Sequence, residues 1–260
     1  MSLLGTIIDT KKQEILSLPD VMPIPSSRPS FIDAVLQHTP ALIAEIKPKS
    51  PSEGHLLSRE EVPTLVDLYS KHAQAISVLC DRTFFGGGYD LLQEVRSLTD
   101  TPLLAKEFII DAKQIRYAAH CGADAVLLIA AQLTSEQLVA FSSLAVELGL
   151  SVLVEVHTEA EIRKLADTYR GLSSAVQQQI LVGINNRNLD TLRVDLSVTE
   201  QLAPIIRTLM PSMRGVLSES GIHTREDVVG LQSHVQGFLI GTSILQAKNR
   251  ASYLTSLFPS

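Results

Sequence analysis

An acid and a base, Glu45 and Lys47, alternate at the end of an apolar run that begins at Ala41. Side chains two residues apart on a strand share a face, so the carboxylate and the ammonium group would project side by side. Charged groups at the end of a buried strand lower stability unless they are paired or solvated. The pair fits either acid–base chemistry or a structural ion pair, and this segment alone does not separate the two.

Lys106 and Glu155 stand in the apolar segments LLAKEF and LVEVH. Burial lowers the pKa of a lysine and neighbouring acids raise it, so Lys106 can act as a general acid or form a Schiff base. The structural alternative is an ion pair of Lys106 with Glu107 or another acid. We expect Lys106 and Glu155 to be catalytic, and we interpret His157 as part of a loop or helix start.

Asn185 and Arg187, in NNRN, share a face and are suited to orienting a polar substrate. The planar guanidinium group of Arg187 can bind a carboxylate through two parallel hydrogen bonds or stack against an aromatic ring. The alternative is a turn stabilised by asparagine side chains.

Two late segments, ESGI (219–222) and IGTS (240–243), each place a glycine where the backbone can approach a ligand. In barrels, the loops after the last two strands commonly bind phosphate through backbone N–H groups. The glycine-rich FFGGG (84–88) lacks the lysine and serine of a P-loop and reads as a mobile loop.

Eight short apolar runs, typical of strands buried on both faces, carry these residues near their C-terminal ends. They begin 21 to 35 residues apart, which leaves room for one helix and two loops in each unit. Repeated units of this kind predict an α/β fold, a (β/α)8 TIM barrel, in which the strand ends form one mouth. A doubly wound sheet is the alternative, but it gathers polar residues near one switch point. The runs span residues 41–47, 75–81, 102–108, 123–130, 151–157, 180–186, 215–220 and 237–242.

The segments between these runs have helical spacing and begin with short polar caps at Asp111, Thr134, Thr158 and Thr224. Pro204 is expected to shorten or kink its helix. Residues 1–40 contain two amphipathic stretches, Leu3 to Leu16 and Phe31 to Leu36, separated by a Pro-rich segment.

We predict that residues 1–40 form an N-terminal helical extension packed outside a barrel of residues 41–260, in a single domain. A flexible arm that orders with substrate is the alternative for the extension.

Composition excludes several classes of protein. The chain has 22 Lys and Arg residues against 28 Asp and Glu, with a net charge of −6 and no basic cluster, so we expect no nucleic-acid partner. Cys80 and Cys121 predict neither a disulfide nor a zinc site, and the acids are not spaced like a metal cage, so we expect no metal. No apolar run reaches the ~20 residues of a membrane span, and the N-terminus does not resemble a signal peptide. We expect a cytoplasmic protein without membrane contact.

The ordered set of motifs resembles the indole-3-glycerol-phosphate synthase family of tryptophan biosynthesis from about residue 3 to the C-terminus. The segments are ALIAEIKPKSPSEG, AISVLCDRTFFGGG, LLAKEFIIDAKQI, GADAVLLIAAQL, LVEVHTEAEI, VGINNRNLDTL, ESGI and FLIGTS. The resemblance implies a (β/α)8 barrel with a helical extension. It also implies a carboxy-lyase that converts 1-(2-carboxyphenylamino)-1-deoxyribulose 5-phosphate into indole-3-glycerol phosphate, carbon dioxide and water without a cofactor. The expected partner is this small molecule, and the expected state is a monomer or weak oligomer.

The resemblance also implies roles for individual residues. Lys106 would be the general acid, Lys47 would meet the carboxylate that is lost, and Glu45 and Glu155 would complete the catalytic set. The expected substrate-binding residues are Ser50, Phe108, Leu128, Asn185, Arg187, Glu219 and Leu239. The expected phosphate-binding residues are Ser50, Ser220, Gly221, Gly241 and Thr242.

Three positions depart from the family pattern. Glu107 stands where Asp is usual, Glu53 replaces a basic residue, and Thr242 replaces a serine. The change at Glu53 is the one expected to alter loop closure or substrate affinity. Three alternative functions remain for a barrel of this kind: a phosphoribosylanthranilate isomerase, a Schiff-base aldolase that uses Lys106, and a phosphate-binding barrel without catalysis.

Overall fold

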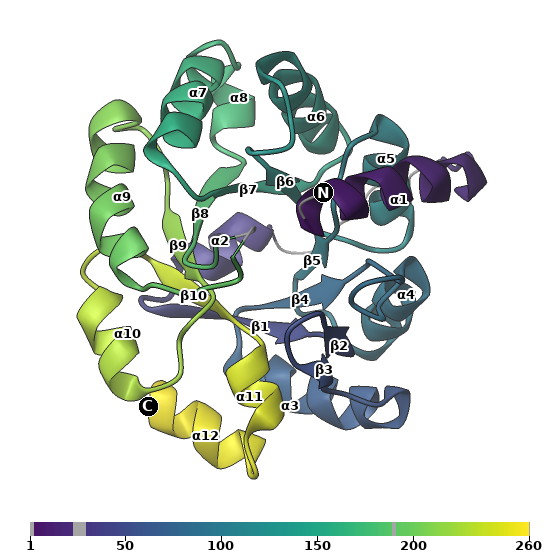
Figure 1. Ribbon diagram of the computed structural model, residues 1–260, viewed down its shortest axis with the longest axis vertical. Helices are drawn as coiled ribbons and strands as arrows, with labels where there is room; N and C mark the ends of the chain where they lie inside the picture. The colour runs from purple at the N-terminus through teal and green to yellow at the C-terminus, as the bar shows by residue number, and fades with distance from the viewer. Residues whose placement is uncertain (1–2, 23–29, 189–190, 260) are drawn as a thin grey trace.

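Eight parallel strands close into a barrel in a computed structural model that describes residues 3–22, 30–188 and 191–259 (Figure 1). The strand order around the barrel is β1-β10-β9-β8-β7-β6-β5-β4, with every neighbouring pair parallel. The closed ring confirms the predicted barrel and excludes the doubly wound sheet. The strands are β1 (Ala41–Ile46), β4 (Ala75–Leu79), β5 (Leu103–Lys106), β6 (Ala125–Ile129), β7 (Ser151–Val156), β8 (Ile180–Asn185), β9 (Val216–Glu219) and β10 (Gly237–Ile240).

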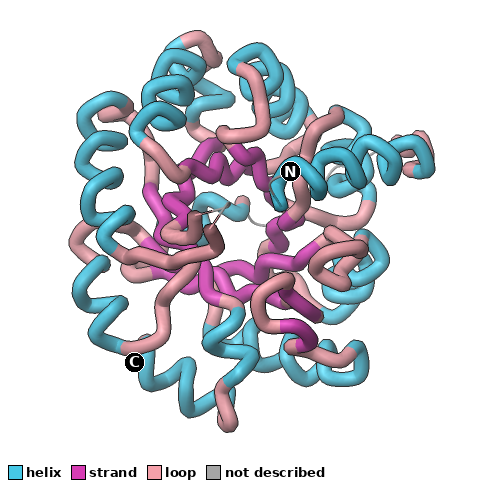
Figure 2. Tube along the Cα trace, viewed as in Figure 1, coloured by secondary structure: helices cyan, strands magenta, loops and turns pink. Residues whose placement is uncertain are grey.

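Helices surround the ring of strands (Figure 2), and a short hairpin of β2 (Lys49–Ser50) and β3 (Gly54–His55) follows β1. The predicted caps are confirmed, because the side chains of Asp111, Thr134, Thr158 and Thr224 each accept a hydrogen bond from the first turn. The helices are η1 (Arg59–Glu61), α3 (Val62–His72), α4 (Tyr89–Leu98), α5 (Ala112–His120), α6 (Ser135–Glu147), α7 (Glu159–Arg170), α8 (Ser174–Gln177), α9 (Ser197–Leu209), α10 (Arg225–Leu231), α11 (Thr242–Gln246) and α12 (Arg250–Leu257).

Pro204 does not shorten its helix, contrary to expectation, since α9 runs through it from Ser197 to Leu209. A proline inside a helix costs about 3 kcal/mol. The burial of Leu202, Ala203 and Ile206 on the inner face of α9 offsets this cost.

Side chains alternate between two apolar layers along each barrel strand. On β1, Ala41 and Ile43 pack inside the barrel, whereas Leu42, Ala44 and Ile46 pack in the layer shared with the surrounding helices. This alternation follows from the period of two in a strand. It places the acid Glu45 on the inner face, above Ala41 and Ile43.

The two helices of the N-terminal extension lie at opposite ends of the barrel. The second stretch forms α2 (Phe31–Leu36), whose Phe31, Ile32 and Val35 join the inner apolar cluster at the N-terminal ends of the strands. In Figure 1, α2 lies behind the ring of strands and is seen through it. Thus α2 closes the end of the barrel opposite the mouth and buries its apolar face there.

The first stretch forms α1 (Leu3–Ser17), which lies against the C-terminal ends of β4 and β5. Residues 23–29, which link α1 and α2 along the chain, fall outside the described part. Within the described ranges, no helix is long and apolar enough to span a membrane.

Candidate active site

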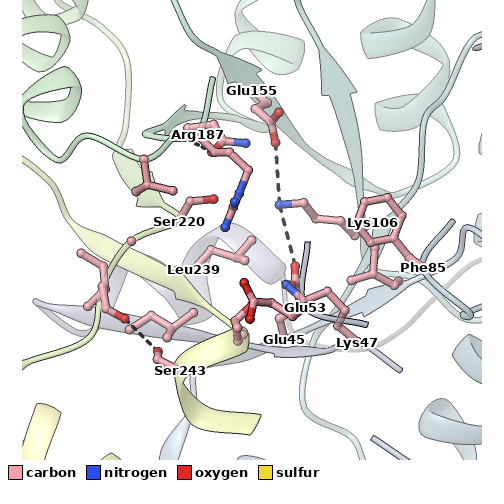
Figure 3. A pocket seen from close by; sticks show the side chains of 18 of the residues that line it. Glu45, Lys47, Glu53, Phe85, Lys106, Glu155, Arg187, Ser220, Leu239 and Ser243 are labelled. Atoms are coloured by element: carbon pink, nitrogen blue, oxygen red, sulfur yellow. Dashed lines mark hydrogen bonds and ion pairs between the residues drawn. The ribbon is translucent and has the colours of Figure 1, made fainter. Parts of the chain in front are cut away.

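A cavity of about 350 Å³ opens at the C-terminal mouth of the barrel (Figure 3). It collects polar side chains from strands far apart in the sequence, as predicted for a closed barrel. Most of the predicted site residues line it: Glu45, Lys47, Lys106, Phe108, Glu155, Asn185, Arg187, Ser220, Gly221, Leu239, Gly241 and Thr242.

Lys106 lies at the centre of a buried cluster of charges. Its Nζ is 2.5 Å from Glu219 Oε2, 3.7 Å from Glu155 Oε2 and 3.9 Å from Glu45 Oε2. A second lysine, Lys47, places its Nζ 2.9 Å from Glu45 Oε1. The structure therefore extends the predicted Glu45–Lys47 pair into a network that crosses the barrel.

The pKa of Lys106 reflects two opposing effects. Burial favours the neutral amine, but the carboxylates of Glu219, Glu155 and Glu45 outweigh burial and raise the pKa above its usual value. Lys106 is therefore an ammonium group at neutral pH, which suits a proton donor and opposes attack by the free amine on a carbonyl group.

The acids around Lys106 do not titrate alike. Burial raises the pKa of Glu219, and the nearby Lys106 only partly compensates. The pKa of Glu45 is lowered, because Lys47 and Lys106 together overcome its burial. The pKa of Glu155 is also lowered against its burial, and His157 contributes most to that change. Environments that separate the pKa values of neighbouring carboxyl groups are typical of acid–base sites.

The loops after β9 and β10 border the cavity, as expected for a phosphate site. Ser220 and Gly221 both have positive φ angles, 68° and 88°. A positive φ is strained for serine, and such strain tends to collect at functional sites. The Ser243 hydroxyl donates to the Ile222 carbonyl at 2.8 Å, which joins the two loops.

Gly241 stands at the N-terminal end of α11, directly beside Glu45. A β-carbon at this position would lie 2.6 Å from Glu45 Oε1, so a larger residue would displace the acid. The glycine therefore makes room for the catalytic candidate Glu45.

Three predicted residues lie outside the lining of the main cavity. Leu128 does not line the cavity, because it points into the layer between β6 and the helices. Its neighbours Leu127 and Ile129 face the cavity instead, since a shift of one residue along a strand reverses the face. Ser50 lines a smaller adjoining cavity of about 90 Å³. Glu219 is 1% exposed and is placed beneath the main cavity, where it contacts Lys106.

The smaller cavity lies between α1 and the mouth. Leu3, Leu4 and Ile7 of α1 face Phe85 and Phe108 across it, and the two phenylalanine rings are 6.0 Å apart. Lys47 and Arg187 line the same space. The apolar wall predicted from Phe108 is thus completed by α1 and by the loop after β4, neither of which the sequence pattern had assigned to the site.

Lys11 of α1 is 1% exposed and was missed in the sequence. Its Nζ lies 2.8 Å from Asp81 Oδ2, 3.0 Å from Glu107 Oε1 and 2.7 Å from Glu14 Oε2. Asp81 Oδ1 accepts hydrogen bonds from the backbone of Phe84 and Phe85. The lysine thereby connects α1 to the loop that borders the smaller cavity.

Glu107, one of the departures from the family pattern, pairs with the buried Lys11. Burial raises the pKa of Glu107 to about 7, although Lys11 opposes the change. Glu107 directly follows β5 and pairs with Lys11 of α1, whereas Lys106 pairs with the acids at the centre of the mouth. Glu53, another departure from the family pattern, lines the main cavity, and its Oε2 accepts a hydrogen bond from Gln246 at 3.2 Å.

Across the described ranges, no three His, Cys, Asp or Glu side chains are grouped to hold a metal ion.

The fold and the mouth together define a (β/α)8-barrel enzyme with an acid–base site. The sequence matches the family model described as indole-3-glycerol phosphate synthase over residues 6–257. An indole-3-glycerol phosphate synthase of Bacillus cereus is 38% identical over 257 residues, covering 97% of this chain and 96% of that protein. One of Legionella pneumophila is 40% identical over 236 residues, covering 90% and 86%. The chain belongs to the indole-3-glycerol phosphate synthase family, whose members are carboxy-lyases of tryptophan biosynthesis.

A longer relative, the tryptophan biosynthesis protein TrpCF of Vibrio parahaemolyticus, is 39% identical over 226 residues. That match covers 87% of this chain but only 45% of the Vibrio protein, so the chain spans less than half of that relative.

Solved structures share the fold at low identity. The tryptophan synthase A-subunit of Pyrococcus furiosus has a TM-score of 0.61 and 14% identity, over 86% of this chain and 99% of that one. The KGPDC of Streptococcus mutans has a TM-score of 0.59 and 17% identity, over 84% and 95%.

Proposed function

We propose that Lys106 is the general acid of the synthase reaction, in which 1-(2-carboxyphenylamino)-1-deoxyribulose 5-phosphate closes to indole-3-glycerol phosphate. As the aromatic carbon attacks the ketone carbon, a carbon–carbon bond forms and the ketone oxygen takes the proton of Lys106. The observation that carries this role is the position of the ammonium group at the cavity floor, within 3.9 Å of three carboxylates that keep it protonated.

Lys47 and Glu45 are proposed to serve the later steps. The Lys47 ammonium group meets the substrate carboxylate, which leaves as carbon dioxide and returns its bonding electrons to the ring. Glu45, 2.9 Å from Lys47, and Glu155, 3.7 Å from Lys106, then move the protons needed to release the hydroxyl group as water. Glu219 holds Lys106 in place at 2.5 Å.

The remaining residues are proposed to hold the substrate. Arg187 and Asn185 bind the anthranilate part and the hydroxyl groups, and Phe108 and Leu239 form an apolar wall. Ser50 approaches the substrate from the smaller cavity. The phosphate would be held by Ser220, Gly221, Gly241 and Thr242, whose loops end at the mouth. A doubly anionic substrate fits a mouth that gathers Lys47, Lys106 and Arg187 within an acidic protein.

The chain is further proposed to act in the cytoplasm as a monomer or weak oligomer, without nucleic acid. Support comes from its net charge of −6, which opposes binding to a phosphate backbone. Light scattering of the purified protein tests the oligomeric state, and a tight dimer would contradict it.

The test of the activity is direct. Addition of the carboxyphenylamino-deoxyribulose phosphate to the purified protein should produce indole absorbance and fluorescence, together with carbon dioxide. Absence of the indole signal would contradict the proposal. Borohydride should not trap the substrate on Lys106, because the protonated lysine does not form an imine; trapping would favour an aldolase instead.

A further inference from the structure

His157 lies between two carboxylates directly behind the cavity, and the reaction described above does not use it. Its Nδ1 is 3.3 Å from Glu161 Oε2, within hydrogen-bond distance. Its Nε2 is 3.2 Å from Glu155 Oε1, an ion-pair distance, but is not oriented for a hydrogen bond and has no other hydrogen-bond partner among the described residues. The three side chains are 10%, 3% and 15% exposed, so solvent screens these ion pairs little. The other oxygen of Glu155, Oε2, faces Lys106 at 3.7 Å.

The turn between β7 and α7 fixes this arrangement. Glu161 Oε2 also accepts a hydrogen bond from the His157 backbone at 2.8 Å, and its Oε1 accepts one from the Thr158 hydroxyl at 3.1 Å. Glu161 is thereby anchored in the first turn of α7. The charged groups that contact His157 are Glu155 of β7 and Glu161 of α7.

We propose that His157 is a positioning residue that, as an imidazolium held by Glu161, keeps the Glu155 carboxylate ionised and directed at Lys106. Glu155 then enters each catalytic cycle as a base. The inference rests on the catalytic role proposed for Glu155 and adds a residue, and a charge state, to that role.

A comparison with Glu219 supports the proposal. Both carboxylates are buried and both contact Lys106, with Glu219 the closer at 2.5 Å against 3.7 Å for Glu155. Proximity to Lys106 would therefore give Glu219 the lower pKa. The opposite holds: the pKa of Glu219 is raised by burial, whereas the pKa of Glu155 is lowered despite burial. Two partners that Glu155 has and Glu219 lacks, the His157 imidazole and the Asn185 amide, contribute to the difference, and His157 contributes more.

His157 itself is suited to carry the charge. Burial favours neutral imidazole, but Glu155 and Glu161 outweigh burial and raise the pKa of His157 to about 10. The imidazole is thus charged throughout the neutral range.

The variant His157→Gln tests the role of the charge, because an amide retains a hydrogen-bond donor but carries no charge. We expect the acid limb of the kcat profile to move upward by at least one pH unit, because Glu155 loses the charge that keeps it ionised. KM is expected to change less than twofold. The matched control is His72→Gln at the exposed end of α3, which should leave the profile unchanged. A His157→Gln profile that superimposes on that of the wild type would overturn the proposal.

NMR titration of the wild-type imidazole provides a measurement that needs neither a variant nor turnover. The ring nitrogens of His157 should show an imidazolium up to at least pH 9, and a neutral ring at pH 8 would overturn the proposal. If the wild type showed an imidazolium but no indole formation, the proposed function would fail while the ion pair of His157 stood.

Discussion

Gly183 of β8 leaves the space that the Glu219 carboxylate of β9 occupies. A β-carbon at position 183 would overlap Glu219 Oε1, which has no hydrogen-bond partner in the described part of the chain. The other oxygen, Oε2, lies 2.5 Å from Lys106 Nζ. The glycine therefore determines how the acid reaches the lysine across the interior of the barrel.

Replacing Gly183 by alanine should move Glu219 away from Lys106. We expect kcat to fall by on the order of tenfold and the free energy of unfolding to fall by about 1–3 kcal/mol, as for other overpacked interiors. Steady-state kinetics and urea unfolding measure the two effects. Gly230→Ala in α10 is the matched control, because a β-carbon there meets nothing within 4 Å; wild-type kinetics for Gly183→Ala would contradict the account.

Lys11→Met should release α1 from the mouth. Removal of the ammonium group leaves Asp81 and Glu107 buried without their cation, and breaking a buried pair in this way costs about 3–5 kcal/mol. We expect the backbone amides of α1 to exchange with solvent more than tenfold faster. A tenfold change needs a loss of only about 1.4 kcal/mol in the free energy that holds α1 in place. KM should rise as well, because α1 borders the smaller cavity.

The neighbouring Lys12→Met is the control for Lys11. Lys12 is 60% exposed and pairs with Asp9 on the same helix, and exposed pairs contribute about 0–1 kcal/mol. Its exchange pattern should match the wild type. Equal protection of α1 in the Lys11 and Lys12 variants would show that the buried lysine does not hold the helix.

Arg187→Ala should weaken substrate binding more than turnover. The guanidinium group extends into the cavity, with one nitrogen 3.2 Å from the Leu192 carbonyl (Figure 3). Loss of one charged contact to a carboxylate is worth about 1.5–3 kcal/mol, so KM should rise at least tenfold. Arg193→Ala, at an exposed position of the same loop, should leave KM unchanged. A large fall in kcat with normal KM would instead assign Arg187 to the chemical steps.

The stability contributed by His157 should depend on pH with a defined sign. Its pKa in the folded protein is raised to about 10 from the ordinary 6.5, so the folded state binds the proton more tightly. The stabilisation is complete below about pH 6.5 and is lost as the pH rises towards 10. The difference in unfolding free energy between wild type and His157→Gln should therefore shrink from pH 6 to pH 10; a constant difference would contradict the raised pKa.

The barrel and most of its mouth could be predicted because the relevant patterns are local. Each buried strand is a short apolar run, and Glu45, Lys106 and Glu155 interrupt such runs near their ends. Once the runs are assigned to a barrel, the strand ends must converge. His157 could have been found in the same way, since it lies two residues after Glu155 on the same face.

The remaining features depend on contacts between distant segments. Lys11 meets Asp81 and Glu107, about 70 and 96 residues away in sequence, and nothing near Lys11 indicates that it is buried. The apolar face of α2 predicts burial but not which end of the barrel provides it. Leu128, which the family resemblance placed at the substrate, lies in AVLLI, a fully apolar strand with no polar residue to mark which leucine faces inward.

Turnover by Lys106→Ala tests the central claim most directly. The variant should bind the carboxyphenylamino-deoxyribulose phosphate with a Kd within about threefold of the wild type, while indole formation falls by on the order of 10²–10⁴-fold through loss of the general acid. Lys71→Ala, an exposed lysine paired with Asp67 on α3, is the control and should react normally. Indole formation by Lys106→Ala at the wild-type rate would contradict the account.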